Sequence, residues 1–166
     1  MWKESLRTGV IPTPLKVGTI CPIYKGGDRT KPKNYRPVTL TSHVIKIFEK
    51  VIVKYLSNYL ENNNLFNDQQ HGFRNKRSCL SQLLDHFHRI VESLNEGKDV
   101  DVVYLDFAKA FDKVDPKILL KKIFKIGIRG KLYQWIRSFL TNRKQKVCIE
   151  GTYSQVFDVK SGVPQG

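Results

Sequence analysis

The sequence predicts an α+β fold, and three observations support this prediction. Short β-branched and aromatic runs, bounded by turn residues, indicate strands. Longer stretches with apolar residues at helical spacing indicate amphipathic helices. Finally, a basic hairpin and helices precede residues 100–105, a predicted buried strand that ends at the carboxylate of Asp106.

Size and charge narrow the class of protein. With 166 residues, 40% of them hydrophobic and 11% aromatic, the chain can form the core of one domain or of two small subdomains. Its 29 Lys and Arg residues against 15 Asp and Glu residues give a net charge of +14. Such an excess indicates a polyanionic partner, with nucleic acid first and an anionic membrane second.

The positive charge is concentrated in two segments. Residues 16–54 carry nine Lys or Arg and two acidic residues, and residues 117–146 carry ten Lys or Arg and no acidic residue. Either segment alone fits a solvated helix face equally well. Because the two segments flank a candidate active site, we favour a track for a phosphate backbone, with strongly salt-dependent binding.

Cysteine usage and hydropathy indicate an intracellular protein. Cys21, Cys79 and Cys148 are far apart and odd in number, so we expect buried free thiols rather than disulfides or zinc ligands. No apolar run approaches the length of a membrane span, and the first residues do not form a signal peptide. Secretion and membrane insertion are therefore not expected.

The expected elements follow from turn residues and capping residues. Residues 1–15 are expected to be irregular, because Gly9, Pro12 and Pro14 interrupt them. The remaining elements, in chain order, are strands at 18–24 and 35–40 joined as a hairpin, a helix from a Thr41 or Ser42 cap to 62–64, a helix from Ser78 to Gly97, the strand at 100–105, helices at 116–126 and 132–140, and extended runs at 145–149 and 155–159.

Asp106 has two readings on spacing alone. A carboxylate at the end of a buried strand can leave the core and face solvent or a metal ion, because an unpaired buried charge costs several kcal/mol. An aspartate in this place can equally cap the next helix.

Four sequence blocks carry a resemblance to a known family. They are ICPIYKGGD with NYRPVTLTSHVIKIFEKVI, then QHGFRNKRS, then YLDFAKAFDKVD, and finally SGVPQG. In this order and spacing, covering nearly all 166 residues, they resemble the reverse transcriptase domain of non-LTR (LINE-type, jockey-like) retrotransposons. The resemblance implies the fingers and partial palm of a right-hand polymerase, with 1–99 as the fingers region and 100–166 as the partial palm. It also implies a piece of a longer polyprotein, truncated at both ends.

The resemblance assigns a metal site to the third block. Asp106 matches the catalytic aspartate that binds two Mg²⁺ ions, and the backbone carbonyl of Phe107 matches a further oxygen ligand. Two-metal nucleotidyl transfer fits these residue types, because Mg²⁺ prefers carboxylate and carbonyl oxygens.

It also assigns nucleotide contacts. Lys25 and Arg36 match residues that bind the triphosphate, and Phe111 matches the aromatic residue that closes against the sugar and rejects a 2′-hydroxyl. Gln165 and Gly166 match the segment beside the incoming nucleotide. Without the family match, Lys25 reads as a solvated hairpin lysine and Phe111 as an ordinary core residue.

The implied partners are an RNA template, a DNA primer, deoxynucleoside triphosphates and the rest of the polyprotein. The predicted nucleic-acid-binding residues are Lys31, Lys33, Arg74 and Arg77. For Arg74, organisation of the fingers is an alternative to contact with the template. An intracellular location is expected, and the nucleus in particular, because the family primes synthesis on chromosomal DNA.

The chain departs from the family pattern in one respect. The Ala-Asp-Asp block that supplies the remaining metal ligands is expected after Pro-Gln-Gly and is absent here. Asp112 and Asp115 follow the predicted strand, and Asp101 points to its opposite face, so none replaces that block. The isolated chain is therefore expected to be inactive. Two alternatives are a noncatalytic nucleic-acid-binding remnant and an unstable product without a role.

Overall fold

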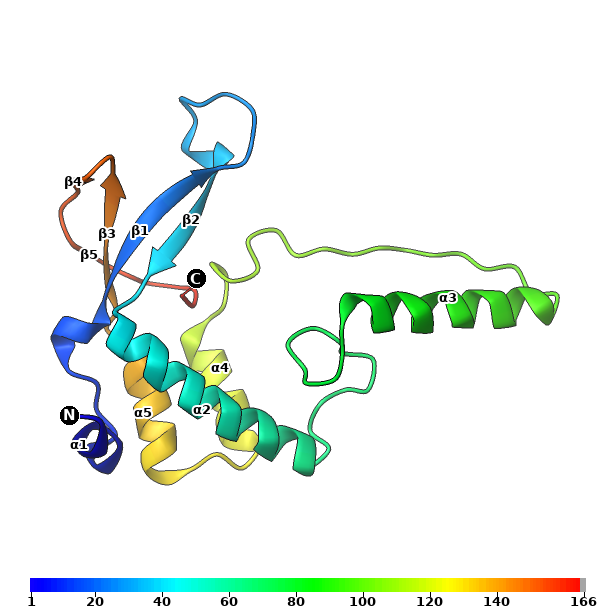
Figure 1. The fold of residues 1–166 in the computed structure, drawn as a ribbon, viewed down its shortest axis with the longest axis horizontal. Helices are drawn as coiled ribbons and strands as arrows, with labels where there is room; N and C mark the ends of the chain where they lie inside the picture. Colours follow the sequence, from blue (N-terminus) through cyan, green and yellow to red (C-terminus); the bar gives the residue numbers. More distant parts are fainter. Residues whose placement is uncertain (165–166) are drawn as a thin grey trace. The chain divides into compact units, whose positions relative to one another are not determined.

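The computed structural model describes residues 1–164 and divides the chain into two compact units (Figure 1). The first unit comprises Met1–Lys50 and Ala108–Gly166, and the second comprises Val51–Phe107. These boundaries do not coincide with the predicted ranges 1–99 and 100–166, and the assignment to fingers and palm stays a prediction. The mixture of helices and a sheet confirms the α+β class.

The first unit is built on a five-stranded sheet, with strand order β2-β1-β3-β4 and β5 paired to β3. Its strands are β1 (Val17–Tyr24), β2 (Tyr35–Leu40), β3 (Lys144–Ile149), β4 (Thr152–Tyr153) and β5 (Phe157–Asp158). The predicted hairpin is confirmed, because β1 and β2 are antiparallel with Ile23 opposite Arg36. Strand β3 joins the other edge of β1 in parallel, with Lys144 opposite Val17. Of the extended run predicted at 155–159, only the two residues of β5 form a strand.

The four predicted helices are present with boundaries within two residues of those predicted. They are α2 (His43–Asn62), α3 (Cys79–Asn95), α4 (Pro116–Lys125) and α5 (Gly130–Leu140). Ser78 caps α3 as predicted, since its side chain accepts a hydrogen bond from the backbone N–H of Ser81. Gly97 follows the end of α3 with a φ of 73°, a conformation that glycine adopts at little cost.

The prediction of an irregular segment over residues 1–15 is wrong. Helix α1 (Trp2–Thr8) forms and ends at Gly9 in the left-handed conformation, and the short 3₁₀ helix η1 (Thr13–Lys16) follows. The cause is packing over a long sequence distance. The ring of Trp2 meets that of Phe48 edge-on at 4.6 Å, and Phe48 in turn meets Trp135 at 4.8 Å.

Trp135 lies at the centre of the core of the first unit. Its side chain is 2% exposed, and its Nε1–H donates to Oγ of Ser5 over 3.1 Å. The hydroxyl of Ser5 donates to the carbonyl of Val10 over 2.6 Å, so each buried polar group of this pair has a partner. The hydrophobic residues buried in the described chain are Ile11, Ile45, Phe48, Ile52, Leu120, Ile128, Trp135, Ile136 and Leu140.

The prediction of a strand at residues 100–105 is wrong. The segment is irregular and returns beside α3 in the second unit, where the hydroxyl of Tyr104 meets Nε2 of His86 at 3.0 Å (Figure 1). A strand requires a neighbour that supplies backbone hydrogen bonds. Within residues 1–164, no segment pairs with this run.

The apolar stripe of α3 is present but largely exposed in the described chain. Its exposed members are Leu80, Leu83, Leu84, Phe87, Val91 and Leu94. The cysteines also differ from the prediction, because Cys79 is exposed and Cys21 and Cys148 are only partly buried, although all three are free thiols. Among residues 1–164, no helix combines the length and the hydropathy that crossing a membrane requires.

We predict that Ser5→Ala destabilises the protein by about 1–3 kcal/mol, because it leaves the buried Trp135 N–H and the Val10 carbonyl without their partner. Urea unfolding followed by tryptophan fluorescence measures this change. The matched substitution Ser93→Ala on α3 should change the free energy of unfolding by less than about 0.5 kcal/mol. Equal effects of the two substitutions would contradict the role of Ser5.

Candidate functional site

The structure joins two sequence motifs that lie about fifty residues apart. The backbone N–H of Val163 donates to the carbonyl of Phe111 over 2.9 Å, and the N–H of Gly162 donates to the carbonyl of Val114 over 2.8 Å. These bonds hold the segment before Pro164 against the turn that follows Asp106 in sequence. The side chain of Phe111 is 41% exposed, so it is not a buried core residue and is accessible to a ligand.

Glycine is required at position 162 for two reasons. Its φ is +82°, and a Cβ atom there would lie 2.9 Å from both Cα and the carbonyl oxygen of Asp112. Real Cβ atoms do not approach backbone atoms this closely, and the neighbouring atoms belong to main chain that cannot rotate away. The contact between the two motifs therefore depends on the missing side chain.

Arg143 holds the same segment from the other side. Its buried guanidinium donates through Nη1 to the carbonyl of Gly162 over 2.8 Å, and burial lowers the pKa of this group. Lys16, half-buried on the other side of a small cavity, donates to the carbonyl of Thr141 over 3.1 Å, and burial lowers its pKa as well. Sequence analysis had counted both residues only as parts of charged segments.

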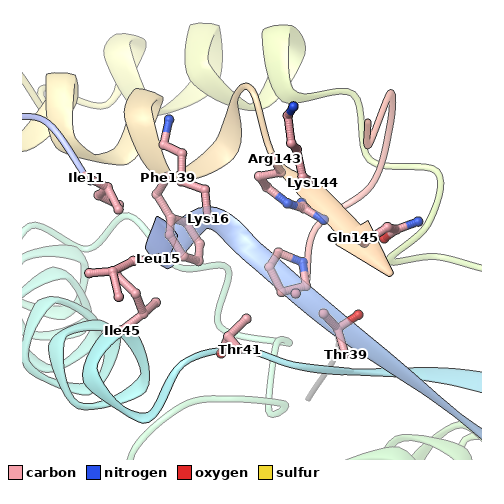
Figure 2. A pocket seen from close by; sticks show the side chains of 12 residues that line it. Ile11, Leu15, Lys16, Thr39, Thr41, Ile45, Phe139, Arg143, Lys144 and Gln145 are labelled. Carbon is pink, nitrogen blue, oxygen red and sulfur yellow. The ribbon is translucent and has the colours of Figure 1, made fainter. Parts of the chain in front are cut away.

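The cavity between Lys16 and Arg143 is shown in Figure 2. It lies at the start of β1, between β2, β3 and the end of α5. Its volume of about 20 Å³ admits about one water molecule and is too small for a nucleotide. Among residues 1–164, no predicted nucleotide-binding residue lines it, so we assign it to packing of the Gly162 segment.

Lys25 and Arg36 share one side of the β1–β2 hairpin. Arg36 lies opposite Ile23, and Lys25 follows two residues after Ile23, so the alternation of strand side chains places it diagonally from Arg36 on the same face. Both residues are exposed. Both cations therefore face solvent, and their contact with a triphosphate stays a prediction.

The loop that joins β1 to β2 is internally ordered. The carboxylate of Asp28 accepts from the backbone N–H and the hydroxyl of Thr30, which together hold the pKa of Asp28 below its usual value. The Tyr35 hydroxyl donates to the carbonyl of Arg29 over 2.9 Å. Lys31 and Lys33 are exposed on this loop, which is compatible with their predicted contact with nucleic acid.

Asp106 lies in the irregular segment of the second unit and not at the end of a strand, so that part of the prediction is wrong. Its side chain is exposed, as is Phe107. Helix α4 is capped by Asp115 instead, whose carboxylate accepts from the N–H of Lys117 over 2.7 Å. Among residues 1–164, His, Cys, Asp and Glu side chains form no group of three or more that could hold a metal ion.

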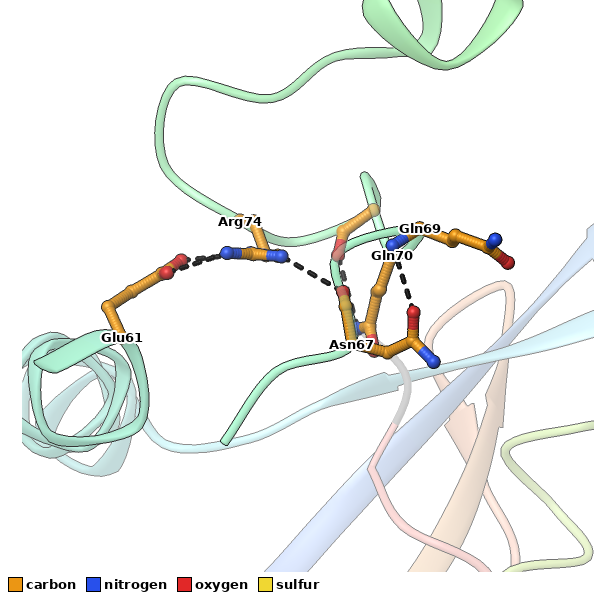
Figure 3. A network of polar contacts seen from close by, with 6 residues as sticks. Glu61, Asn67, Gln69, Gln70 and Arg74 are labelled. Carbon is orange, nitrogen blue, oxygen red and sulfur yellow. Dashed lines mark hydrogen bonds and ion pairs between the residues drawn. The ribbon is translucent and has the colours of Figure 1, made fainter. Parts of the chain in front are cut away.

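Arg74 is bound within the second unit (Figure 3). Its Nε and Nη2 donate to the two carboxylate oxygens of Glu61 over 3.0 and 2.7 Å, and Nη1 donates to the carbonyl of Asn67 over 2.9 Å. The guanidinium also lies over the ring of Phe66 at 5.1 Å. The Arg74 side chain is only 10% exposed and its donors are engaged within the second unit, whereas both organisation of the fingers and contact with the template stay predictions. Arg77 is exposed.

The partners of Arg74 were not found by sequence reasoning. Glu61 lies thirteen positions away on another element, and no local pattern marks it. Arg143 likewise carries no signal besides its charge. The predicted residues Gln165 and Gly166 lie outside the described residues.

The comparisons with known proteins agree with the joined motifs and the basic hairpin. A family model described as reverse transcriptase (RNA-dependent DNA polymerase) matches residues 23–166. The chain therefore belongs to the reverse transcriptase family.

Its relatives come from mobile elements. The RNA-directed DNA polymerases from mobile element jockey of Drosophila funebris and Drosophila melanogaster are each 32% identical over the whole chain, which covers 18% of their length. The retrovirus-related Pol polyprotein from type-1 retrotransposable element R2 of Popillia japonica is 27% identical over 97% of the chain and 22% of its own length. The chain thus spans about a fifth of these relatives.

We predict that Gly162→Ala separates the two motifs. The substitution should destabilise the first unit by more than about 1 kcal/mol and speed hydrogen exchange at the Val163 amide, because the new Cβ collides with the backbone of Asp112. Gly151→Ala is the matched control, since Gly151 has a φ of +81° but nothing within 4 Å of its Cβ position. Similar losses of stability in Gly162→Ala and Gly151→Ala would show that backbone strain alone, and not the collision with Asp112, destabilises the protein.

We predict that the Glu61–Arg74 pair makes stability depend on pH. Arg74 holds the pKa of Glu61 below its usual value of 4.5, so the contribution is complete above about pH 4.5 and is lost as the pH falls through the lower folded-state value. The urea midpoints of the native protein and Glu61→Gln are measured at pH 7, 5.5, 4 and 3. The two midpoints should therefore differ at neutral pH and converge in acid. At neutral pH the urea midpoint of Arg74→Lys should resemble that of Glu61→Gln, because lysine cannot form the bidentate contact with the carboxylate. The control Arg89→Lys, in an exposed pair with Asp85, should have little effect at any pH.

Proposed function

We propose that the chain is part of an RNA-directed DNA polymerase that copies an RNA template from a DNA primer. The observation that carries this proposal is the bonding of Phe111 to Val163, which joins the two motifs that match the catalytic and nucleotide-facing parts of the family. The exposed cations of the β1–β2 hairpin add the positive surface that such a reaction requires.

In this proposal Lys25 and Arg36 bind the triphosphate of the incoming nucleotide. A lysine offers a point charge and an arginine a planar pair of donors, and both suit phosphate oxygens. Phe111 contacts the sugar, and its exposure leaves the ring free to do so. Gln165 and Gly166 complete the nucleotide site by family resemblance.

Binding of two magnesium ions requires more oxygen ligands than Asp106 and Phe107 supply. Asp106 and the Phe107 carbonyl provide two oxygen ligands of the type that Mg²⁺ prefers, but one carboxylate is too few for two ions. We therefore infer that the isolated chain does not catalyse synthesis, and we derive no reaction step through the metal. Further ligands have to come from the longer polypeptide in which the family domain occurs.

A second candidate function is noncatalytic binding of nucleic acid. It is favoured by the net charge of +14 together with the incomplete metal site among residues 1–164. Both functions require a basic surface, but only the polymerase function also requires Asp106 and the nucleotide contacts of Lys25 and Phe111.

We predict that Asp106→Asn abolishes DNA synthesis by the full-length polyprotein and changes its affinity for an RNA–DNA primer–template less than twofold. Lys25→Gln should raise KM for the nucleotide about tenfold or more, because it removes a charged contact worth about 1.5–3 kcal/mol. The exposed Lys54→Gln serves as a control of equal charge. Primer-extension kinetics and fluorescence anisotropy measure the two properties. Undiminished synthesis by Asp106→Asn would refute the catalytic proposal, whereas no binding by the 166-residue chain at low salt would refute the noncatalytic one.

A further inference from the structure

We propose that helices α4 and α5 carry a separate binding surface for the phosphodiester backbone of nucleic acid, centred on Arg129. This surface lies outside the proposed nucleotide site. Figure 1 shows the α4–α5 turn and the tip of the β1–β2 hairpin at opposite ends of the first unit. We call it the α4–α5 basic surface, and its members are Lys117, Lys121, Lys122, Lys125, Arg129, Lys131 and Arg137.

The charges of this surface are exposed and are not neutralised by neighbouring carboxylates. All seven side chains are exposed, and in the part of the chain that the structure describes none of them forms an ion pair. The excess also belongs to one unit. The first unit has 23 Lys and Arg against 7 Asp and Glu, whereas the second has 6 against 8.

The arrangement does not serve the stability of the helices. Lys117, Lys121 and Lys125 follow one another at spacings of four residues, where like charges destabilise a helix by about 0.2–0.5 kcal/mol per pair. Arg129 and Lys131 lie at the start of α5, where the helix dipole disfavours positive charge. Only the cations in the C-terminal turns of the helices, such as Lys125, are stabilised by the helix dipole.

Arg129 is held in place by aromatic side chains. Its guanidinium lies 3.4 Å from the ring centroid of Phe124, and Phe124 meets Tyr133 edge-on at 5.5 Å. One donor of Arg129 is engaged, by the carbonyl of Ile128 over 3.1 Å. A guanidinium that is fixed in this way loses little side-chain freedom when its other donors bind a phosphate.

A nucleic acid fits this surface better than a membrane does. Helices that bind membrane surfaces insert an apolar face below the headgroups. Here Leu120 of α4 and Trp135 of α5 are buried in the core, and the exposed apolar side chains of α4 are Ile118 and Phe124, at 56% and 48%. The guanidinium of Arg129 lies over the ring of Phe124. Two exposed apolar side chains do not make an insertable face, whereas seven exposed cations lie on two packed helices and the turn between them.

The test compares two variants of the 166-residue chain with equal net charge. One carries Lys117→Gln, Lys121→Gln and Lys125→Gln, and the control carries Lys3→Gln, Lys50→Gln and Lys160→Gln, all at exposed positions. Fluorescence anisotropy with 20-base-pair RNA, DNA and RNA–DNA duplexes between 50 and 200 mM NaCl gives affinity and salt dependence. The first variant should reduce the slope of log K against log salt by about 2–3, whereas the control should change it by less than about 1. The three duplexes show whether the backbone bound is RNA or DNA.

A second variant leaves the charge unchanged. Phe124→Leu removes the ring beneath Arg129 and should weaken duplex binding about threefold or more, whereas Tyr153→Leu, beneath Lys146, should not. The proposal is overturned if the two triple variants lose affinity equally, if Phe124→Leu binds as the native chain does, or if the first triple variant loses affinity only for phosphatidylserine vesicles. These results are independent of the proposed polymerase function, which depends on Asp106 and Lys25 in primer extension.

Discussion

The close approach of Gly162 to the backbone of Phe111 and Asp112 is the constraint on which the first unit depends. These positions are about fifty residues apart, and α4, α5, β3, β4 and β5 all lie in the chain between them. Closing a loop of this length costs several kcal/mol of chain entropy. The cost is offset by the packing of α5 against α1 and of β3 against β1, so the joined motifs and the core require each other.

Arg143 connects this constraint to the core. A buried guanidinium is unfavourable unless its donors are satisfied, and here one donor binds the carbonyl of Gly162. The residue sits one position before β3, so the parallel pairing of β3 with β1 fixes where its side chain reaches. The position of Gly162 is thereby set by the sheet as well as by its close approach to Asp112.

Local signals predicted much of the fold. The hairpin follows from two β-forming runs around a Gly-rich loop, and α2 to α5 follow from apolar spacing and from caps such as Ser78. Helix α1 was missed because its stability comes from Trp2 on Phe48, a contact that no local pattern encodes. The binding of Arg74 by Glu61 was missed for the same reason, since sequence reveals the charge and not its partner.

The failed strand at residues 100–105 shows a different limit. Its alternation of β-branched and aromatic residues is a real preference for extended backbone, but a strand exists only when another strand satisfies its N–H and C=O groups. The same pairing would fix the direction of Asp106, whose carboxylate has to be held firmly to bind a metal ion. Burial of Val103, Tyr104 and Leu105, which are 78–92% exposed here, would accompany that pairing and favour it. Within residues 1–164 no segment supplies that pairing, so the apolar neighbours of the aspartate stay exposed and no strand orients Asp106.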